Sequence, residues 1–174
     1  MYVFDFCQNM AGFTTLRIPD GLATKAGVAI SMQHDEPVSG PPPAPAFNQY
    51  GATTETNTYI TKGDGAAIEY TALFTYAGFR YVQLTGYPGV PTQETLTAHF
   101  AHTDYDMIGS ITFSDPMLDA VQHITRAAAM SNFQSIPTDC PQRERRGWLG
   151  DAQLSTETNM HNFDSTFWAV TVIL

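Results

Sequence analysis

Residues 139–151 gather side chains that can bind and cleave a sugar. This stretch, Asp-Cys-Pro-Gln-Arg-Glu-Arg-Arg-Gly-Trp-Leu-Gly-Asp, holds three carboxylates, three arginines and one of the two tryptophans of the chain. An indole ring offers an apolar face on which a sugar can stack, and carboxylates and guanidinium groups hydrogen-bond its hydroxyls. A carboxylic acid in such a group can protonate a glycosidic oxygen. The residue types therefore predict a carbohydrate active site.

The same charges also have a purely structural interpretation. Asp139 and Asp151 could cap helices, and Glu144 could form a solvated ion-pair cluster with the arginines around it. Against this, the Cys-Pro and Gly-Trp pairs interrupt the stretch, so one continuous exposed helix is not expected. An exposed ion-pair cluster also has no need of Trp148. These features favour a binding loop.

The active-site signature of the bacterial α-L-rhamnosidases resembles residues 131–153 of this chain almost residue for residue. These residues read Ser-Asn-Phe-Gln-Ser-Ile-Pro-Thr-Asp-Cys-Pro-Gln-Arg-Glu-Arg-Arg-Gly-Trp-Leu-Gly-Asp-Ala-Gln. Segments 5–12, 74–86 and 114–118 match the same family in the same order, so the resemblance covers nearly the whole chain. One departure is Cys7, where that family usually has glycine.

This resemblance implies an inverting glycosidase whose catalytic domain is an (α/α)6 barrel. It implies that Glu144 is the general acid, and that Asp139, Arg143 and Asp151 hold the rhamnose hydroxyls. Trp148 matches a residue that lines the sugar pocket. The implied substrate is a terminal non-reducing α-L-rhamnose residue of a glycoside or polysaccharide, and the implied chemistry needs no cofactor.

The catalytic base is the part of this mechanism that the chain lacks. In the resembled family it is a glutamate on a later part of the barrel, and no upstream acid stands at a matching position. Glu157 and Asp164 are the nearest acids, but they are interpreted as a helix-surface residue and a helix cap. We therefore expect an inactive fragment of a longer enzyme.

Short β-branched and aromatic runs dominate the first two thirds of the chain. They predict a jelly-roll-like β-sandwich in an accessory domain, residues 1–113. Residues 37–56 contain Gly-Pro-Pro-Pro-Ala-Pro and no hydrophobic period, which indicates a long surface loop. The expected strands are 2–6, 13–18, 28–33, 58–61, 68–74, 79–84 and 96–100.

At Ser114 the period changes to that of helices. A cap at Ser114 or Asp115 with Pro116 in the first turn predicts a helix that fades near 131–133. A loop over 134–150 and a short helix from Asp151 to His161 should follow. The first helix carries an apolar stripe, expected to be buried, of Met117, Leu118, Val121, Ile124, Thr125 and Ala128. Residues 114–174 are thus predicted to begin an α/α-barrel catalytic domain.

A third helix is expected from the cap Asp164, with large apolar side chains up to Leu174. Burying one such side chain stabilises a fold by about 1.5–3 kcal/mol. Because the pattern stops without a C-cap, we expect that the chain is a truncated piece and that its true N-terminus is also missing.

Composition excludes several classes of function. A net charge of −9 with only eight Lys+Arg residues leaves no basic stripe for nucleic acid. No run of about 18 apolar residues predicts a membrane span, and the first residues lack the features of a signal peptide. Cys7 and Cys140 form neither a disulfide framework nor a metal-binding spacing, so no metal is expected.

A non-catalytic carbohydrate-binding sandwich is the alternative function. Tyr76, Phe79 and Tyr81 could form its binding platform, although their strand positions favour a core and strand-pairing role. A pure binding module has no reason to hold the carboxylates, Arg143 and Trp148 of the 139–151 stretch in register.

Overall fold

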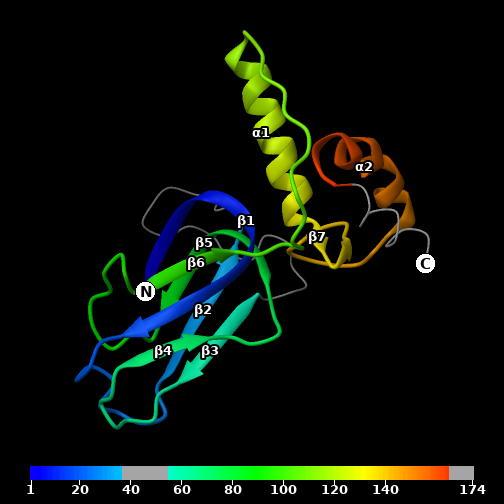
Figure 1. Cartoon of the computed structure of the whole chain (residues 1–174). Coiled ribbons are helices and arrows are strands. Elements are labelled where there is room, and N and C mark those ends of the chain that lie inside the picture. The colour runs from blue at the N-terminus through cyan, green and yellow to red at the C-terminus, as the bar shows by residue number, and fades with distance from the viewer. Residues whose placement is uncertain (37–54, 165–174) are drawn as a thin grey trace. The chain divides into compact units, whose positions relative to one another are not determined.

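The computed structural model describes residues 1–36 and 55–164. The chain divides into two compact units, Met1–Phe100 and Ala101–Leu174 (Figure 1). The first unit is built from strands, and the described part of the second carries two helices. Residues 101–113 contain no strand and group with the second unit, so the units separate before the helical period starts at Ser114.

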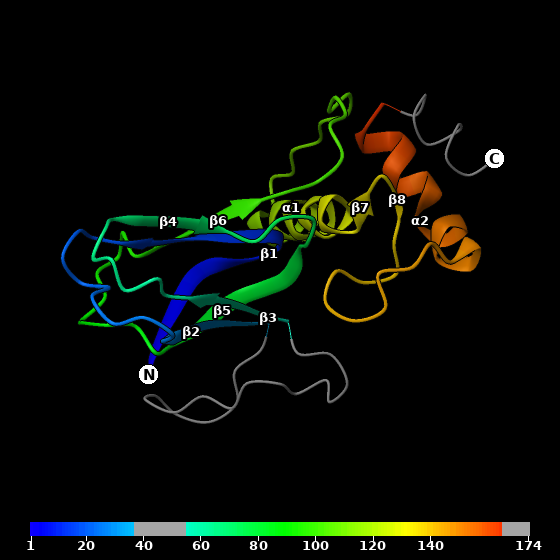
Figure 2. The ribbon, with the colours of Figure 1, turned by 90° about the horizontal axis from the view of Figure 1, so that it is seen from below.

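The six strands of the first unit form one antiparallel sheet in the order β3-β2-β5-β1-β4, and β6 also pairs with β1. β1 changes partners along its length, from β5 over its first part to β4 and β6 over its second. The sheet therefore curls into two facing layers (Figure 2), the predicted jelly-roll-like arrangement. The bounds are β1 (Tyr2–Ile18), β2 (Ala29–Asp35), β3 (Thr56–Ile60), β4 (Ile68–Thr71), β5 (Ala77–Thr85) and β6 (Leu96–Phe100).

β1 combines the two strands expected at 2–6 and 13–18. Its pairing register with β5 shifts between Asp5 and Met10, which absorbs the polar residues between the two runs. Cys7 lies in this irregular stretch with φ +64°, a left-handed conformation that glycine adopts at much lower cost. This conformation explains why glycine suits the position that Cys7 occupies.

The core of the first unit lies between the two layers of the curled sheet. Phe79 is fully buried on β5 and meets the ring of Phe6 edge to face at 5.8 Å. Phe79 is therefore a core residue and cannot form part of an exposed sugar-binding platform. The other buried apolar side chains of this core are Leu16, Ile18, Ala23, Ile30, Met32, Ala77, Val82, Leu84 and Leu96.

α1 (Pro116–Ser131) begins and ends as the sequence predicts. The carboxylate of Asp115 accepts a hydrogen bond from the backbone N–H of Met117 at 2.9 Å, and proline occupies the first turn. α2 (Leu149–Asn162) begins two residues before the expected start at Asp151. Its N-cap is Trp148, which makes no side-chain capping bond.

The apolar stripe of α1 is not buried as expected. Met117, Leu118, Val121 and Ile124 are all exposed among the described residues, and Ser131 is the one buried residue of this helix. The small core of the second unit lies elsewhere, around Phe133, Ala152 and Tyr105. The expected burial was wrong because nothing in the described part of the chain covers this face of α1.

Two expectations lie outside the described residues. The structure describes only residues 55 and 56 of the loop expected over 37–56, and only the cap position, Asp164, of the third helix. Among the described residues, no helix has the length and apolar character that crossing a membrane requires.

Candidate active site

A short hairpin of two-residue strands directs the chain from the end of α1 into the candidate site. β7 (Phe133–Gln134) pairs with β8 (Ile136–Pro137) through Ser135, which has φ +68°. The backbone N–H of Thr138 then donates to the carbonyl oxygen of Asn132 at 2.7 Å, and its hydroxyl donates to the same oxygen at 3.0 Å. This double contact fixes where the chain leaves the hairpin.

The next segment, residues 139–146, is closed at both ends by Asp139 and Arg146 and is called the acid loop below. The N–H of Asp139 donates to the carbonyl of Arg146 at 3.0 Å, and the N–H of Arg146 donates to Oδ1 of Asp139 at 2.9 Å. The thiol of Cys140 donates to Oδ2 of Asp139 at 3.1 Å. Asp139 is therefore a loop-closing carboxylate and not a helix cap.

The electrostatics of Asp139 favour its ionised form. Burial by itself would raise the pKa of this carboxyl group and is the largest single influence on it. Hydrogen bonds from the Arg146 N–H, from the thiol and backbone of Cys140 and from its own backbone N–H together outweigh burial and hold the pKa of Asp139 below its ordinary value. An ionised carboxylate accepts hydrogen bonds only, which suits contact with sugar hydroxyls.

Arg145 supports the acid loop from within. Its backbone has φ +56°, and its Nε donates to the carbonyl of Pro141 at 2.9 Å. Burial lowers the pKa of this guanidinium group, although arginine stays charged in proteins. The two neighbouring arginines, Arg143 and Arg146, are exposed, so the three arginines of the stretch have different environments.

Both oxygens of Glu144 receive a side-chain donor. Nη2 of Arg143 lies 3.3 Å from Oε1, and the indole Nε1 of Trp148 donates to Oε2 at 3.1 Å. The backbone N–H of Glu144 donates to the sulfur of Cys140 at 3.2 Å. Cys140 therefore links the carboxylate of Asp139 to the backbone of Glu144, whose own carboxylate is contacted by Arg143 and Trp148.

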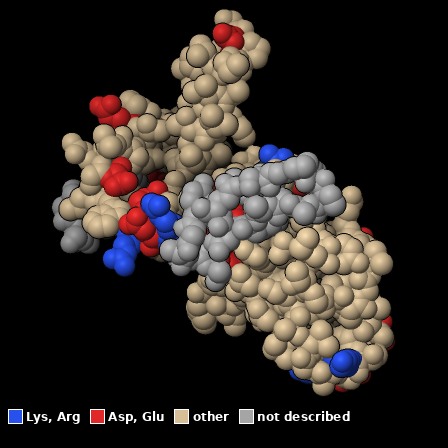
Figure 3. All heavy atoms as spheres, turned by 180° about the vertical axis from the view of Figure 1, so that it is seen from behind, with Lys and Arg blue, Asp and Glu red and all other residues tan. Residues whose placement is uncertain are grey.

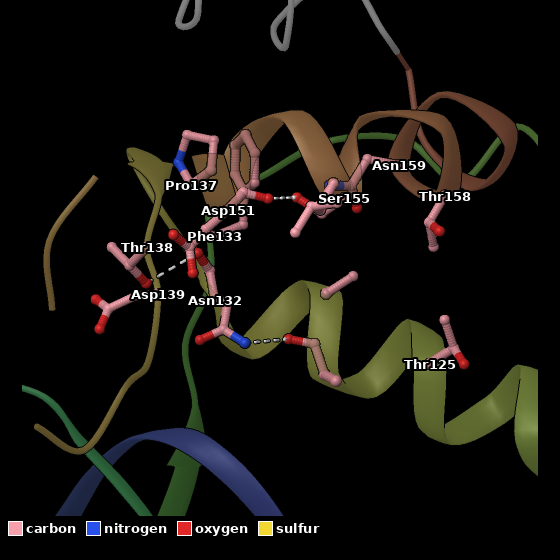
Figure 4. A pocket seen from close by; sticks show the side chains of 13 residues that line it. Thr125, Asn132, Phe133, Pro137, Thr138, Asp139, Asp151, Ser155, Thr158 and Asn159 are labelled. Atoms are coloured by element: carbon pink, nitrogen blue, oxygen red, sulfur yellow. Dashed lines mark hydrogen bonds between the residues drawn. The ribbon is translucent and has the colours of Figure 1, made fainter. Parts of the chain in front are cut away.

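A cavity of about 370 Å³ lies between α1, α2 and the end of β8. Asp139 reaches it from the acid loop and Asp151 from the first turn of α2 (Figure 4). The structure thus brings the two ends of the charged stretch to one cavity. Arg143, Glu144 and Trp148 do not line it, and they form the neighbouring cluster described above.

Most of the cavity lining was missed by the sequence reasoning. Thr125 and Ala128 were assigned to the apolar stripe of the first helix, and they line the cavity with Ala129 and Asn132 at helical spacing. A polar stripe on α2 at the same spacing could have indicated the second wall. It consists of Asp151, Ser155, Thr158 and Asn159 (Figure 4).

Charged side chains are few on the described surface. Figure 3 shows a face where acidic and basic side chains adjoin in one area of the helical unit, while most of that face is uncharged. Among the described residues, no group of three or more His, Cys, Asp or Glu side chains is placed to hold a metal ion.

Comparison with known proteins gives matches over both units. Residues 1–102 match the bacterial alpha-L-rhamnosidase concanavalin-like domain. Residues 106–172 match the bacterial alpha-L-rhamnosidase six-hairpin glycosidase domain. An alpha-L-rhamnosidase of Formosa agariphila is 36% identical in an alignment 173 residues long, which covers 96% of this chain and 18% of that protein.

Solved structures of alpha-L-rhamnosidases also match this chain. The alpha-L-rhamnosidase of Dictyoglumus thermophilum has a TM-score of 0.85 and 38% identity, over 96% of this chain and 18% of that one. The Streptomyces avermitilis alpha-L-rhamnosidase, solved with L-rhamnose, has a TM-score of 0.86 and 32% identity, over 97% of this chain and 16% of that one. This chain therefore spans less than a fifth of the length of these relatives.

Proposed function

The chain belongs to the bacterial α-L-rhamnosidase family, and from this premise we propose that it is part of an enzyme that hydrolyses terminal non-reducing α-L-rhamnosides with inversion. The observation that carries the proposal is the meeting of Asp139 and Asp151 at one cavity, with Glu144 tied to Asp139 through Cys140. A relative solved with L-rhamnose supports that sugar as the ligand.

The proposed roles follow from the chemistry of each group. Asp139 and Asp151 accept hydrogen bonds from the rhamnose hydroxyls, and Arg143 donates to the oxygens of the sugar. Trp148 is half exposed and can offer its ring to the sugar face. Glu144, whose side chain is 39% exposed, is the group from which a leaving oxygen can take a proton.

Inversion requires a second carboxylate on the opposite side of the glycosidic bond. The two groups stand about 6.5–9.5 Å apart, so that a water molecule fits between the base and the anomeric carbon. We propose that this base belongs to a part of the enzyme that this chain does not include. The short coverage of the relatives, 16–18% of their length, supports this assignment.

We also propose a boundary between the sandwich and the helical domain. The sequence predicts the accessory sandwich over residues 1–113 and the start of the catalytic barrel over residues 114–174, and we propose to move this boundary back to Phe100. Contacts of residues 101–109 within the helical unit favour counting that segment with the barrel: the N–H of Thr103 donates to the carbonyl of Phe133 at 2.9 Å.

Two measurements on the purified 174-residue chain test this function. We expect no hydrolysis of an aryl α-L-rhamnoside, because the chain supplies the acid but not the base. We expect chemical-shift changes in the second unit when L-rhamnose is added, and none in an Asp139→Asn, Asp151→Asn double variant. Robust turnover would contradict the missing base. Sugar-induced shifts confined to the first unit would instead favour a carbohydrate-binding module.

A further inference from the structure

The contact between Trp148 and Glu144 joins the acid loop to the start of α2. Trp148 is the N-cap of α2, and its carbonyl accepts a hydrogen bond from the N–H of Ala152 at 3.0 Å. Its own N–H donates to the carbonyl of Arg146 at 3.2 Å. The backbone of Trp148 is held on both sides, and its indole Nε1 donates to Oε2 of Glu144 at 3.1 Å.

We infer that Trp148 is a positioning residue for Glu144, and that its indole N–H leaves Oε1 as the oxygen that carries the acid proton. This inference rests on the proposed function and adds to the proposed sugar contact of Trp148. An indole nitrogen can only donate, so Oε2 must accept in this contact. The proton of the carboxylic acid form then resides on Oε1, the oxygen that faces Arg143.

Arg143 contacts Oε1, the oxygen of Glu144 that carries the acid proton in this proposal. A guanidinium group has five donors and no acceptor, and a protonated Oε1 is a weaker acceptor than a carboxylate oxygen, so protonation weakens the contact from Nη2 of Arg143. The weaker contact leaves Arg143 donors available to the sugar oxygens, which are acceptors. Trp148 keeps its contact in both states, because Oε2 accepts whether or not Oε1 is protonated.

With the proton on Oε1, Glu144 can protonate the glycosidic oxygen. The Oε1–H bond of Glu144 breaks as its proton moves to the glycosidic oxygen, and the electron pair of the C1–O bond goes to the departing alcohol. Water forms the new bond to the anomeric carbon and gives its proton to a carboxylate base of the enzyme. Glu144 is left as a carboxylate that Trp148 and Arg143 hold as they do in the structure.

Misplacement of a reacting group by about 1 Å costs up to roughly 100-fold in rate. A test of positioning must remove the indole N–H donor of Trp148 and keep its aromatic ring. In the full-length enzyme that carries this sequence, Trp148 is replaced by benzothienylalanine, which has sulfur in place of the indole N–H. We expect kcat on an unactivated rhamnoside to fall about tenfold or more with KM within about twofold of wild type.

The division of the effect between kcat and KM separates positioning from sugar stacking, because the substituted ring can still stack and only the N–H donor is lost. Leu149→Ala is the control, because Leu149 is exposed beside Trp148 and does not line the cavity. Unchanged kcat in the benzothienylalanine enzyme would overturn the inference and leave the proposed function standing.

A second measurement needs no activity. In the 174-residue chain, Trp168→Phe leaves Trp148 as the single tryptophan, and its fluorescence is followed against pH. We expect a titration step that Glu144→Gln abolishes. A step that survives Glu144→Gln, or no step in either protein, would show that the indole does not sense this carboxylate.

Discussion

The thiol of Cys140 donates a hydrogen bond to Oδ2 of Asp139 at 3.1 Å, inside the loop that also holds Glu144. The same sulfur accepts the backbone N–H of Glu144 at 3.2 Å. Cys140 is a free cysteine, so its role in this loop is hydrogen bonding and not disulfide formation. One partly buried side chain thus links the carboxylate of Asp139 to the backbone of Glu144.

Cys140→Ala should weaken the second unit more than Cys140→Ser does. Alanine removes both hydrogen bonds of the sulfur, at a cost of about 1 kcal/mol or more, whereas a serine hydroxyl can both donate and accept. Urea unfolding of the full chain, followed by tryptophan fluorescence, measures the difference. Cys7→Ser controls for the loss of a thiol, and equal midpoints for the two Cys140 variants would contradict the role of this sulfur.

Cys7→Gly should stabilise the first unit. Cys7 has φ +64°, where a side chain costs about 1–2 kcal/mol and glycine costs little, although glycine also makes the unfolded chain more flexible. A net gain of roughly 0.5–1 kcal/mol is expected in thermal or urea unfolding. Cys7→Ala keeps the Cβ and should show no gain. Stabilisation by alanine as large as that by glycine would exclude backbone strain as the cause.

The stability of the first unit should fall in acid through Asp5. Hydrogen bonds from Arg80, at 2.8 and 2.9 Å, are the main cause that lowers the pKa of Asp5 from its ordinary value of 3.8. Ionised Asp5 therefore stabilises the fold fully above about pH 4, and this contribution disappears as pH falls through the lowered pKa. Asp5→Asn should flatten the dependence of stability on pH below 4, and the surface variant Asp20→Asn should not. Identical slopes in wild type and Asp5→Asn would refute this.

Asp139→Asn and Asp151→Asn should each impair both binding and turnover of the full-length enzyme. Both aspartates reach one cavity, and hydrogen bonds to sugar hydroxyls strengthen toward the transition state. We expect a loss of roughly tenfold or more in kcat/KM for each, with KM raised. Glu157→Gln is the matched control, since Glu157 is exposed on α2 and does not line the cavity. If kcat/KM fell as far in Glu157→Gln as in the aspartate variants, a role of the cavity in sugar binding would be contradicted.

The sequence predicts those features that local patterns determine. Alternating residues locate the strands, and the Asp115 cap with Pro116 locates the start of α1. The closure of the acid loop could not be predicted, because Arg145 adopts φ +56° at a position without glycine. That conformation depends on contacts such as the one from Arg145 to the carbonyl of Pro141.

The cavity was beyond sequence reasoning for a different reason. Its walls come from two helices that are separate in sequence, so the side that Thr125 faces depends on how α1 and α2 pack. The same dependence explains the error over the apolar stripe of α1. The helical spacing of apolar residues identifies an apolar face of α1. Whether Ile124 on that face is buried depends on which other elements pack against it.

The acid role of Glu144 is tested most directly by Glu144→Gln in the full-length enzyme, assayed on an unactivated and on an activated aryl α-L-rhamnoside. Glutamine keeps the shape and cannot supply a proton, so only a poor leaving group suffers fully. We predict a loss of about 100-fold or more in kcat/KM on the unactivated substrate and a far smaller loss on the aryl one. Equal losses on the two substrates would contradict Glu144 as the general acid.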